Sequence, residues 1–276
     1  MSARSLVIAL ASVTLAACSI DWRLARGDGG AGSGASGGGG GAPVLANAAL
    51  LCDRIPSLST EPVVDGKLES GLSLYTWLDE ASRDTRSGVS ANVSLAYRPD
   101  GVYFFAAVVD PTRDPAPLDA LPYCGDGVEL YVDDDGSIRN PPGYDRPGTM
   151  QLIVAAPSGG VAAEHRGERF VNPGNGDGID LGAWSSSRFA AVPTADGYVV
   201  EAFVVATDLD LASWRLAPGA QIGWNLSLNI GGPEPAGIDA CTTRSQQIHF
   251  RLATSDACTA PFCNASAFCA TALLGP

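Results

Sequence analysis

The sequence has few basic residues and few of the side chains that catalysis most often uses. Its 276 residues include 30 Asp and Glu against 17 Lys and Arg, two histidines and a single lysine, Lys67. A net charge of −13 with scattered arginines excludes a typical nucleic-acid surface, because phosphate binding needs clustered positive charge. Outside the glycine-rich residues 27–41, no serine-nucleophile motif, H-E-x-x-H motif or P-loop is present, and no pair of carboxylates stands out for glycoside hydrolysis. We therefore expect no enzymatic activity.

The chain also lacks a hydrophobic run long enough to cross a membrane as a helix. Leu6–Leu15 is apolar over only ten residues, whereas a bilayer core needs about 20. Arg4 precedes this run and Leu15-Ala16-Ala17-Cys18 follows it, an order typical of a targeting segment. The final string resembles the lipobox of bacterial lipoproteins, in which the cysteine is lipidated. The alternative is an ordinary secretory signal cut near Ala17.

The cysteine count favours the lipoprotein. Removing Cys18 from the seven cysteines leaves six, an even number for disulfides, which persist in exported proteins. The spacings among them do not form the paired C-x₂-C units of a zinc site. The candidates for disulfides, of undetermined connectivity, are Cys52, Cys124, Cys241, Cys258, Cys263 and Cys269. We expect a lipid-anchored protein of the bacterial cell envelope, and Ser19 after the cysteine is typical of the outer membrane.

Glycine is concentrated in one segment. Ten of the 33 glycines lie between Gly27 and Gly41, where almost no apolar side chain is available for packing. Such a segment behaves as a flexible coil with a reach of roughly 20 Å. The sequence therefore predicts a signal peptide over residues 1–18, a tether over residues 19–49 and one folded domain over residues 50–276.

Helical periodicity is nearly absent from the rest, which predicts short β-strands. Ala91–Tyr97 and Val102–Val109 flank Pro99-Asp100-Gly101, a typical hairpin turn. Further expected strands are Val128–Val132, Met150–Ala155, Val161–Glu164, Arg188–Val192, Tyr198–Val205, Ile222–Ile230 and Ile248–Leu252. Many short strands joined by hairpins indicate an all-β domain, an antiparallel β-sandwich.

The order of these segments resembles the family 9 carbohydrate-binding modules. Gly125–Asp133 (GDGVELYVD) is similar to the family's D-S-V-E-I/L-Y-V-D strand. The other similar segments are Val63–Glu69, Leu95–Asp110, Asp196–Leu209 and Pro218–Ile230. The resemblance implies a jelly-roll-like sandwich that binds a glycan without catalysis. The alternatives are a structural or adhesive envelope protein that keeps the sandwich without a sugar site, and a related haem-binding sandwich using Met150 and His165.

The resemblance also implies where a sugar would bind. In the family, an aromatic residue before the D-S-V-E strand and that strand's Glu contact the sugar, and these positions carry Tyr123 and Glu129. An aromatic ring covers the apolar face of a sugar while directed polar groups bond its hydroxyls. The candidates for further polar contacts are Gln151, Asn229, Asp239 and Arg244. The family's second aromatic has no counterpart, because residues 231–244 contain no aromatic residue.

Two oxygen-rich loops are candidate calcium sites, because Ca²⁺ prefers hard oxygen ligands. The candidate ligands are Asp133, Asp135, Asp177 and Asp180. Members of the resembled family often hold structural calcium, and the alternative is a pair of solvated acidic turns.

Glu201 stands in an otherwise apolar strand. Such a carboxylate is either edge-exposed or salt-bridged, and we interpret it as structural. We expect the tryptophans Trp77, Trp184, Trp214 and Trp224 to lie in the core.

Overall fold

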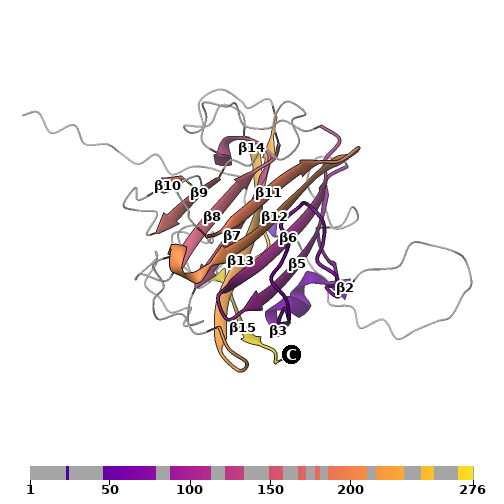
Figure 1. Cartoon of the computed structure of the whole chain (residues 1–276). Coiled ribbons are helices and arrows are strands. Elements are labelled where there is room, and N and C mark those ends of the chain that lie inside the picture. Colours follow the sequence, from indigo (N-terminus) through magenta and orange to yellow (C-terminus); the bar gives the residue numbers. More distant parts are fainter. Residues whose placement is uncertain are drawn as a thin grey trace, which may run out of the picture.

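A computed structural model shows two β-sheets packed face to face (Figure 1). It describes residues 23–24, 46–78, 88–112, 122–133, 149–157, 167–171, 178–180, 186–209, 216–232, 244–251 and 267–275. The sheets have nine and six strands within these ranges, and no α-helix lies in them. The predicted all-β sandwich is therefore confirmed.

The nine-stranded sheet is centred on β13 and β7. Its main path is β1 (Arg23–Leu24), β14 (Arg244–His249), β13 (Gln221–Gly231), β7 (Gly127–Asp133), β8 (Thr149–Ala155), β9 (Gly167–Val171) and β10 (Gly178–Asp180). At the far end of β13, β15 (Cys269–Leu273) takes the place of β14 and pairs in turn with β3 (Arg54–Ile55).

The six-stranded sheet faces it. Its order is β11 (Arg188–Pro193), β12 (Gly197–Val205), β6 (Gly101–Val109), β5 (Ser90–Arg98), β4 (Tyr75–Leu78) and β2 (Ala46–Asn47). Three short 3₁₀ helices, η1 (Ala48–Cys52), η2 (Pro122–Cys124) and η5 (Ala206–Leu209), complete the described elements.

Strand alternation decides which side chains fill the core. Successive residues of a strand point to opposite faces, so Val128, Leu130 and Val132 of β7 pack between the sheets. The same alternation turns Glu129 and Tyr131 to the outer face of the nine-stranded sheet. Trp77 and Trp224 are buried, as expected; Trp184 and Trp214 lie outside the described residues.

Two expectations about the strands need correction or completion. The expected strand Ile248–Leu252 has the wrong bounds, since β14 runs over Arg244–His249 and a bend follows at Phe250. The alanine-rich β15 was not predicted, because its pairing with β13 and β3 rather than local composition makes it a strand. Val161–Glu164 lies outside the described residues.

The N-terminal part of the chain contributes to both sheets. β1 and β2 pair with β14 and β4, although both precede Leu50, near which the sequence predicts that the folded domain begins. Cys18 and Gly27–Gly41 lie outside the described residues. No helix in the described part of the chain is long and apolar enough to span a membrane.

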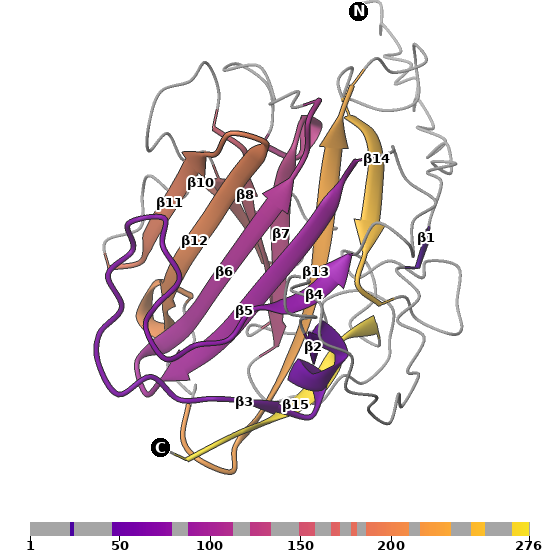
Figure 2. The same cartoon turned by 90° about the vertical axis from the view of Figure 1, so that its right-hand side faces the viewer.

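Residues 58–74, which we call the strap, lie across the outer face of the six-stranded sheet between β3 and β4 (Figure 2). Leucines and Val64 of the strap pack on an aromatic face made by Tyr103, Phe105 and Phe203. The strap thus covers an apolar face that would otherwise be exposed.

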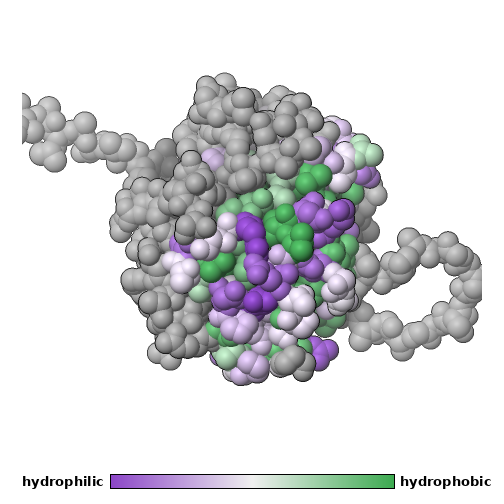
Figure 3. Space-filling view, viewed as in Figure 1, coloured by the Kyte–Doolittle hydropathy of each residue, from purple (hydrophilic) through white to green (hydrophobic). Residues whose placement is uncertain are grey.

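In the view of Figure 1, the described surface mixes hydrophilic and hydrophobic residues (Figure 3).

Glu201 fastens the strap. Its Oε2 accepts the backbone N–H groups of Asp65 at 2.8 Å and Gly66 at 2.6 Å, and its Oε1 accepts the Tyr103 hydroxyl at 2.8 Å. Burial raises the pKa of Glu201 although these hydrogen bonds act in the opposite direction. β12 is an interior strand, so Glu201 is not edge-exposed. Its carboxylate is structural, and within the described residues it is held by two backbone N–H groups and the Tyr103 hydroxyl, not by a salt bridge.

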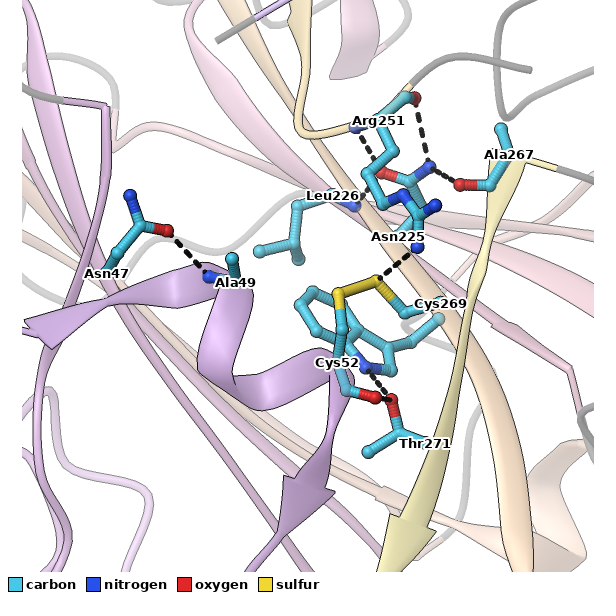
Figure 4. Close-up of a disulfide and its surroundings, with 10 residues drawn as sticks. Asn47, Ala49, Cys52, Asn225, Leu226, Arg251, Ala267, Cys269 and Thr271 are labelled. Atoms are coloured by element: carbon cyan, nitrogen blue, oxygen red, sulfur yellow. Dashed lines mark hydrogen bonds between the residues drawn. A yellow bond between two sulfur atoms is a disulfide. The ribbon is translucent and has the colours of Figure 1, made fainter. Parts of the chain in front are cut away.

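A disulfide joins the beginning and end of the described domain. Cys52 of η1 is bonded to Cys269 of β15 (Figure 4). Below it, Trp224 Nε1 donates to Thr271 Oγ1 at 2.7 Å, which donates to the Cys52 carbonyl at 3.0 Å. Cys124 is also disulfide-bonded. Disulfide formation is thus confirmed for these three cysteines, while Cys241, Cys258 and Cys263 lie outside the described residues.

Candidate functional site

A buried cluster of polar side chains lies on the outer face of the nine-stranded sheet. Its members, which we call the polar cluster, are Glu129, Tyr131, Gln151, Ser227, Asn229, Gln247 and His249. They come from four adjacent strands, β7, β8, β13 and β14, and none is more than 6% exposed. Polar groups are costly to bury unless they are hydrogen-bonded, so the contacts within the cluster decide what it can do.

The strand register brings the cluster together. Ser227 of β13 lies opposite Glu129 of β7 on one side and His249 of β14 on the other. Asn229 is paired with Gln247, and Tyr131 with Gln151. Directly opposed side chains on one face of a sheet are close enough to interact. Residues more than a hundred positions apart therefore meet on one face of the sheet.

Glu129 is the centre of the hydrogen-bond network. Its Oε1 accepts the side-chain amides of Asn229 at 2.7 Å and Gln247 at 2.9 Å. Its Oε2 accepts the Gln151 amide at 2.9 Å and the Tyr131 hydroxyl. Hydrogen bonds to an ionised acceptor are stronger than neutral ones. Four donors thus surround one buried carboxylate.

A second line of hydrogen bonds reaches Glu129 through Tyr131. The Ser227 hydroxyl donates to Tyr131 Oη at 3.3 Å, and Ser227 Oγ is hydrogen-bonded to His249 Nδ1. Either the Ser227 hydroxyl or the His249 ring can donate in this second contact, depending on the imidazole tautomer. A chain in which every hydroxyl donates in the same direction is cooperative. The result is a buried, pre-organised network across three strands.

Two carbonyl oxygens of the cluster have no donor. Asn229 Oδ1 and Gln247 Oε1 are buried and accept no hydrogen bond from the described residues. Both amide nitrogens are bonded to Glu129 Oε1, which fixes the orientation of each amide group. The carboxylate therefore directs both carbonyl oxygens away from itself.

Comparisons with known proteins bear on the fold. No protein-family model and no curated protein sequence matches the chain. Among solved structures, the chain is similar to a family 9 carbohydrate-binding module (CBM9) from Caldicellulosiruptor kristjanssonii in complex with glucose. The TM-score is 0.52, with 19% identity over 81% of this chain and 97% of that chain. The fold is CBM9-like. A structure of a CBM9 from the same organism in complex with cellotriose matches with a TM-score of 0.49 and 21% identity, over 81% and 95% of the two chains.

The CBM9-like sandwich places the predicted sugar contacts as follows. Glu129, Gln151 and Asn229 lie together in the polar cluster. Tyr123 is half-buried in η2, immediately before β7, and Arg244 is the first residue of β14, paired with Gly231. Asp239 lies outside the described residues.

Four members of the cluster were not predicted: Tyr131, Ser227, Gln247 and His249. Alternation contains a signal for Ser227, because the outward positions of β13 read Asn225, Ser227, Asn229 while the inward ones are apolar. Gln247 was hidden because the expected strand began at Ile248. The position of β14 follows from its pairing with β13, which the local sequence does not show.

The turn that precedes β7 is held to β13. Asp126 is fully buried, and its Oδ1 accepts the backbone N–H of Gly231 at 2.5 Å. η2 also packs beside β8 and β13. Tyr123 is therefore carried by a turn fixed at the end of the sheet where Asn229 lies.

The calcium ligands remain predictions. Asp133 ends β7 and is buried, Asp180 belongs to β10, and Asp135 and Asp177 lie outside the described residues. Within the described ranges, no group of three or more His, Cys, Asp and Glu side chains is arranged to hold a metal ion. For the haem alternative, Met150 lies in β8 and His165 is outside those ranges.

Proposed function

We propose that the protein binds a carbohydrate, without catalysis, at the polar cluster of its CBM9-like sandwich. The observation that carries the proposal is the buried network centred on Glu129, on the strand that resembles the family's sugar-contacting strand. Support for the ligand class comes from the similar fold of a module that is in complex with glucose.

The chemistry of the cluster suits a sugar better than a purely structural role. A face that only packed could use apolar side chains, whereas this one buries a carboxylate, three amides and two hydroxyls. Sugar recognition needs a few polar groups held in fixed directions. Tyr123 adds an aromatic ring that would cover the apolar face of a sugar ring.

We further propose that Cys18 is lipidated and that the glycine-rich segment tethers the domain to the bacterial envelope, at the outer membrane. The sequence alone supports this part. A tethered domain with a sugar site would hold the cell envelope close to a glycan.

Isothermal titration with glucose and neutral oligosaccharides, each with and without calcium, tests the function. We expect saturable binding, retained in Tyr123→Phe, which keeps the ring, and weakened in Tyr123→Ala. Stacking of one ring contributes about 1 kcal/mol, which corresponds to a change of about fivefold in affinity. Equal affinity of both variants would reject Tyr123 only. Absence of binding to every glycan would reject the function and favour a structural or adhesive role.

A further inference from the structure

All the acceptor capacity of Glu129 is used inside the protein. A carboxylate has about four lone-pair sites, and four donors occupy them, from Asn229, Gln247, Gln151 and Tyr131. A ligand hydroxyl could bond to Glu129 only by displacing one of these donors. Glu129 therefore orients the neighbouring side chains of the network.

The amides of Asn229 and Gln247 are the groups that it orients. Turning either amide over would place a carbonyl oxygen against the carboxylate, so the bonds to Glu129 Oε1 select one orientation. The two residues are a directly opposed pair on neighbouring strands. Their carbonyl oxygens thus form a pair of neighbouring acceptors in a fixed direction.

This acceptor pair has no donor in the described part of the protein. Asn229 and Gln247 are 0% and 2% exposed. A buried acceptor without a partner costs about 1–3 kcal/mol, and native proteins contain few of them. Two such acceptors side by side can accept hydrogen bonds from the donors of a bound molecule.

Resting on the proposed function, we propose that the Asn229–Gln247 acceptor pair selects a neutral sugar with two neighbouring hydroxyl groups, and that Glu129 acts as a positioning residue without touching the sugar. Hydroxyls donate to carbonyl oxygens. Carboxylate and sulfate groups only accept, and the buried Glu129 charge and the net charge of −13 repel them. Gln247 becomes a specificity residue in this account.

The test uses the full chain and measures affinities for glucose, galactose, mannose and xylose. Monodeoxyfluoro derivatives of the sugar that binds best are then compared, because fluorine cannot donate a hydrogen bond. We expect fluorine at two neighbouring positions to weaken binding about tenfold each. In Gln247→Leu, fluorine at one of the two positions should no longer weaken binding, because the carbonyl oxygen that accepted that hydroxyl has been removed.

Glu129→Gln separates positioning from direct contact. If Glu129 orients both amides, this variant loses sensitivity to fluorine at both positions together. If Glu129 contacted the sugar itself, the variant would lose sensitivity at a third position and keep the first two. Gln221→Leu, at an exposed residue at the start of β13, is the matched control and should bind like wild type. Thermal unfolding of each variant verifies that it is folded.

The outcomes distinguish this inference from the proposed function. Binding of glucuronate as tightly as glucose, or full tolerance of every fluorine substitution, would overturn the inference while sugar binding stands. Selective binding of an amino sugar would also overturn it, because an ammonium donor would then be preferred to hydroxyls. Failure of wild type to bind any of the four neutral sugars counts against both.

Discussion

Replacing Glu201 should release the strap from the six-stranded sheet. Glu201→Ala leaves three donors without an acceptor: the backbone N–H groups of Asp65 and Gly66 and the Tyr103 hydroxyl. An unsatisfied buried donor costs about 1–3 kcal/mol. Asp65 is partly exposed, so its N–H can reach water once the turn opens. We therefore expect a total loss of about 3–5 kcal/mol in the free energy of unfolding.

Glu201→Gln should be much milder. The amide oxygen can accept both backbone N–H groups, and the amide nitrogen can donate to Tyr103 Oη, so the expected cost is about 1 kcal/mol. Glu61→Ala is the matched control, because this glutamate also lies in the strap but is exposed and paired with Arg188. An exposed ion pair contributes about 0–1 kcal/mol.

Urea denaturation followed by tryptophan fluorescence measures these differences, and pH adds a second readout. Burial raises the pKa of Glu201 above its ordinary value of 4.5, so the folded protein binds this proton more tightly than the unfolded chain. Wild type should therefore gain stability relative to Glu201→Gln as the pH falls through the folded-state pKa toward 4.5, and lose that gain as the pH rises again. The reasoning fails if Glu201→Ala costs no more than Glu61→Ala, or if wild type loses stability relative to Glu201→Gln on acidification.

Three further predictions concern the backbone, the disulfide and the anchor. Gly66→Ala should destabilise the protein more than Gly71→Ala in urea denaturation. Both glycines have positive φ, but an added Cβ at Gly66 would lie 2.4 Å from Val192 Cγ2 and one at Gly71 would meet nothing; equal costs would contradict this. Removing the Cys52–Cys269 disulfide, which joins residues 217 positions apart, should cost about 3–5 kcal/mol by the same measurement, and an unchanged midpoint would refute it. Cys18→Ala should move the protein from the membrane fraction to the soluble fraction of the producing cell, and lipid labelling that persists in this variant would reject the lipobox.

The sequence predicted the strands well where their own composition defines them. Val102–Val109 and Ile222–Ile230 are β-branched, aromatic or alternating, and both lie within observed strands. β15 and the true position of β14 depend on pairing with β13, so local composition could not define them.

The candidate site was predictable in part for the same reason. The family resemblance pointed to Glu129, and Gln151 and Asn229 were named as further polar candidates on predicted strands. Gln247 could not be found because it lies in the half of β14 that the sequence did not show as strand. Glu201 was recognised as structural, but its backbone partners lie 135 and 136 positions away and leave no pattern in the sequence.

The central claim is that sugar binds at the polar cluster, and a glucose titration followed by nuclear magnetic resonance tests it most directly. The side-chain amide signals of Gln151, Asn229 and Gln247 should shift together with a single dissociation constant. The backbone amide of Gly66, in the strap on the other sheet, should stay unchanged. Saturable shifts confined to the strap, or cluster signals that stay fixed while glucose binds, would contradict the account.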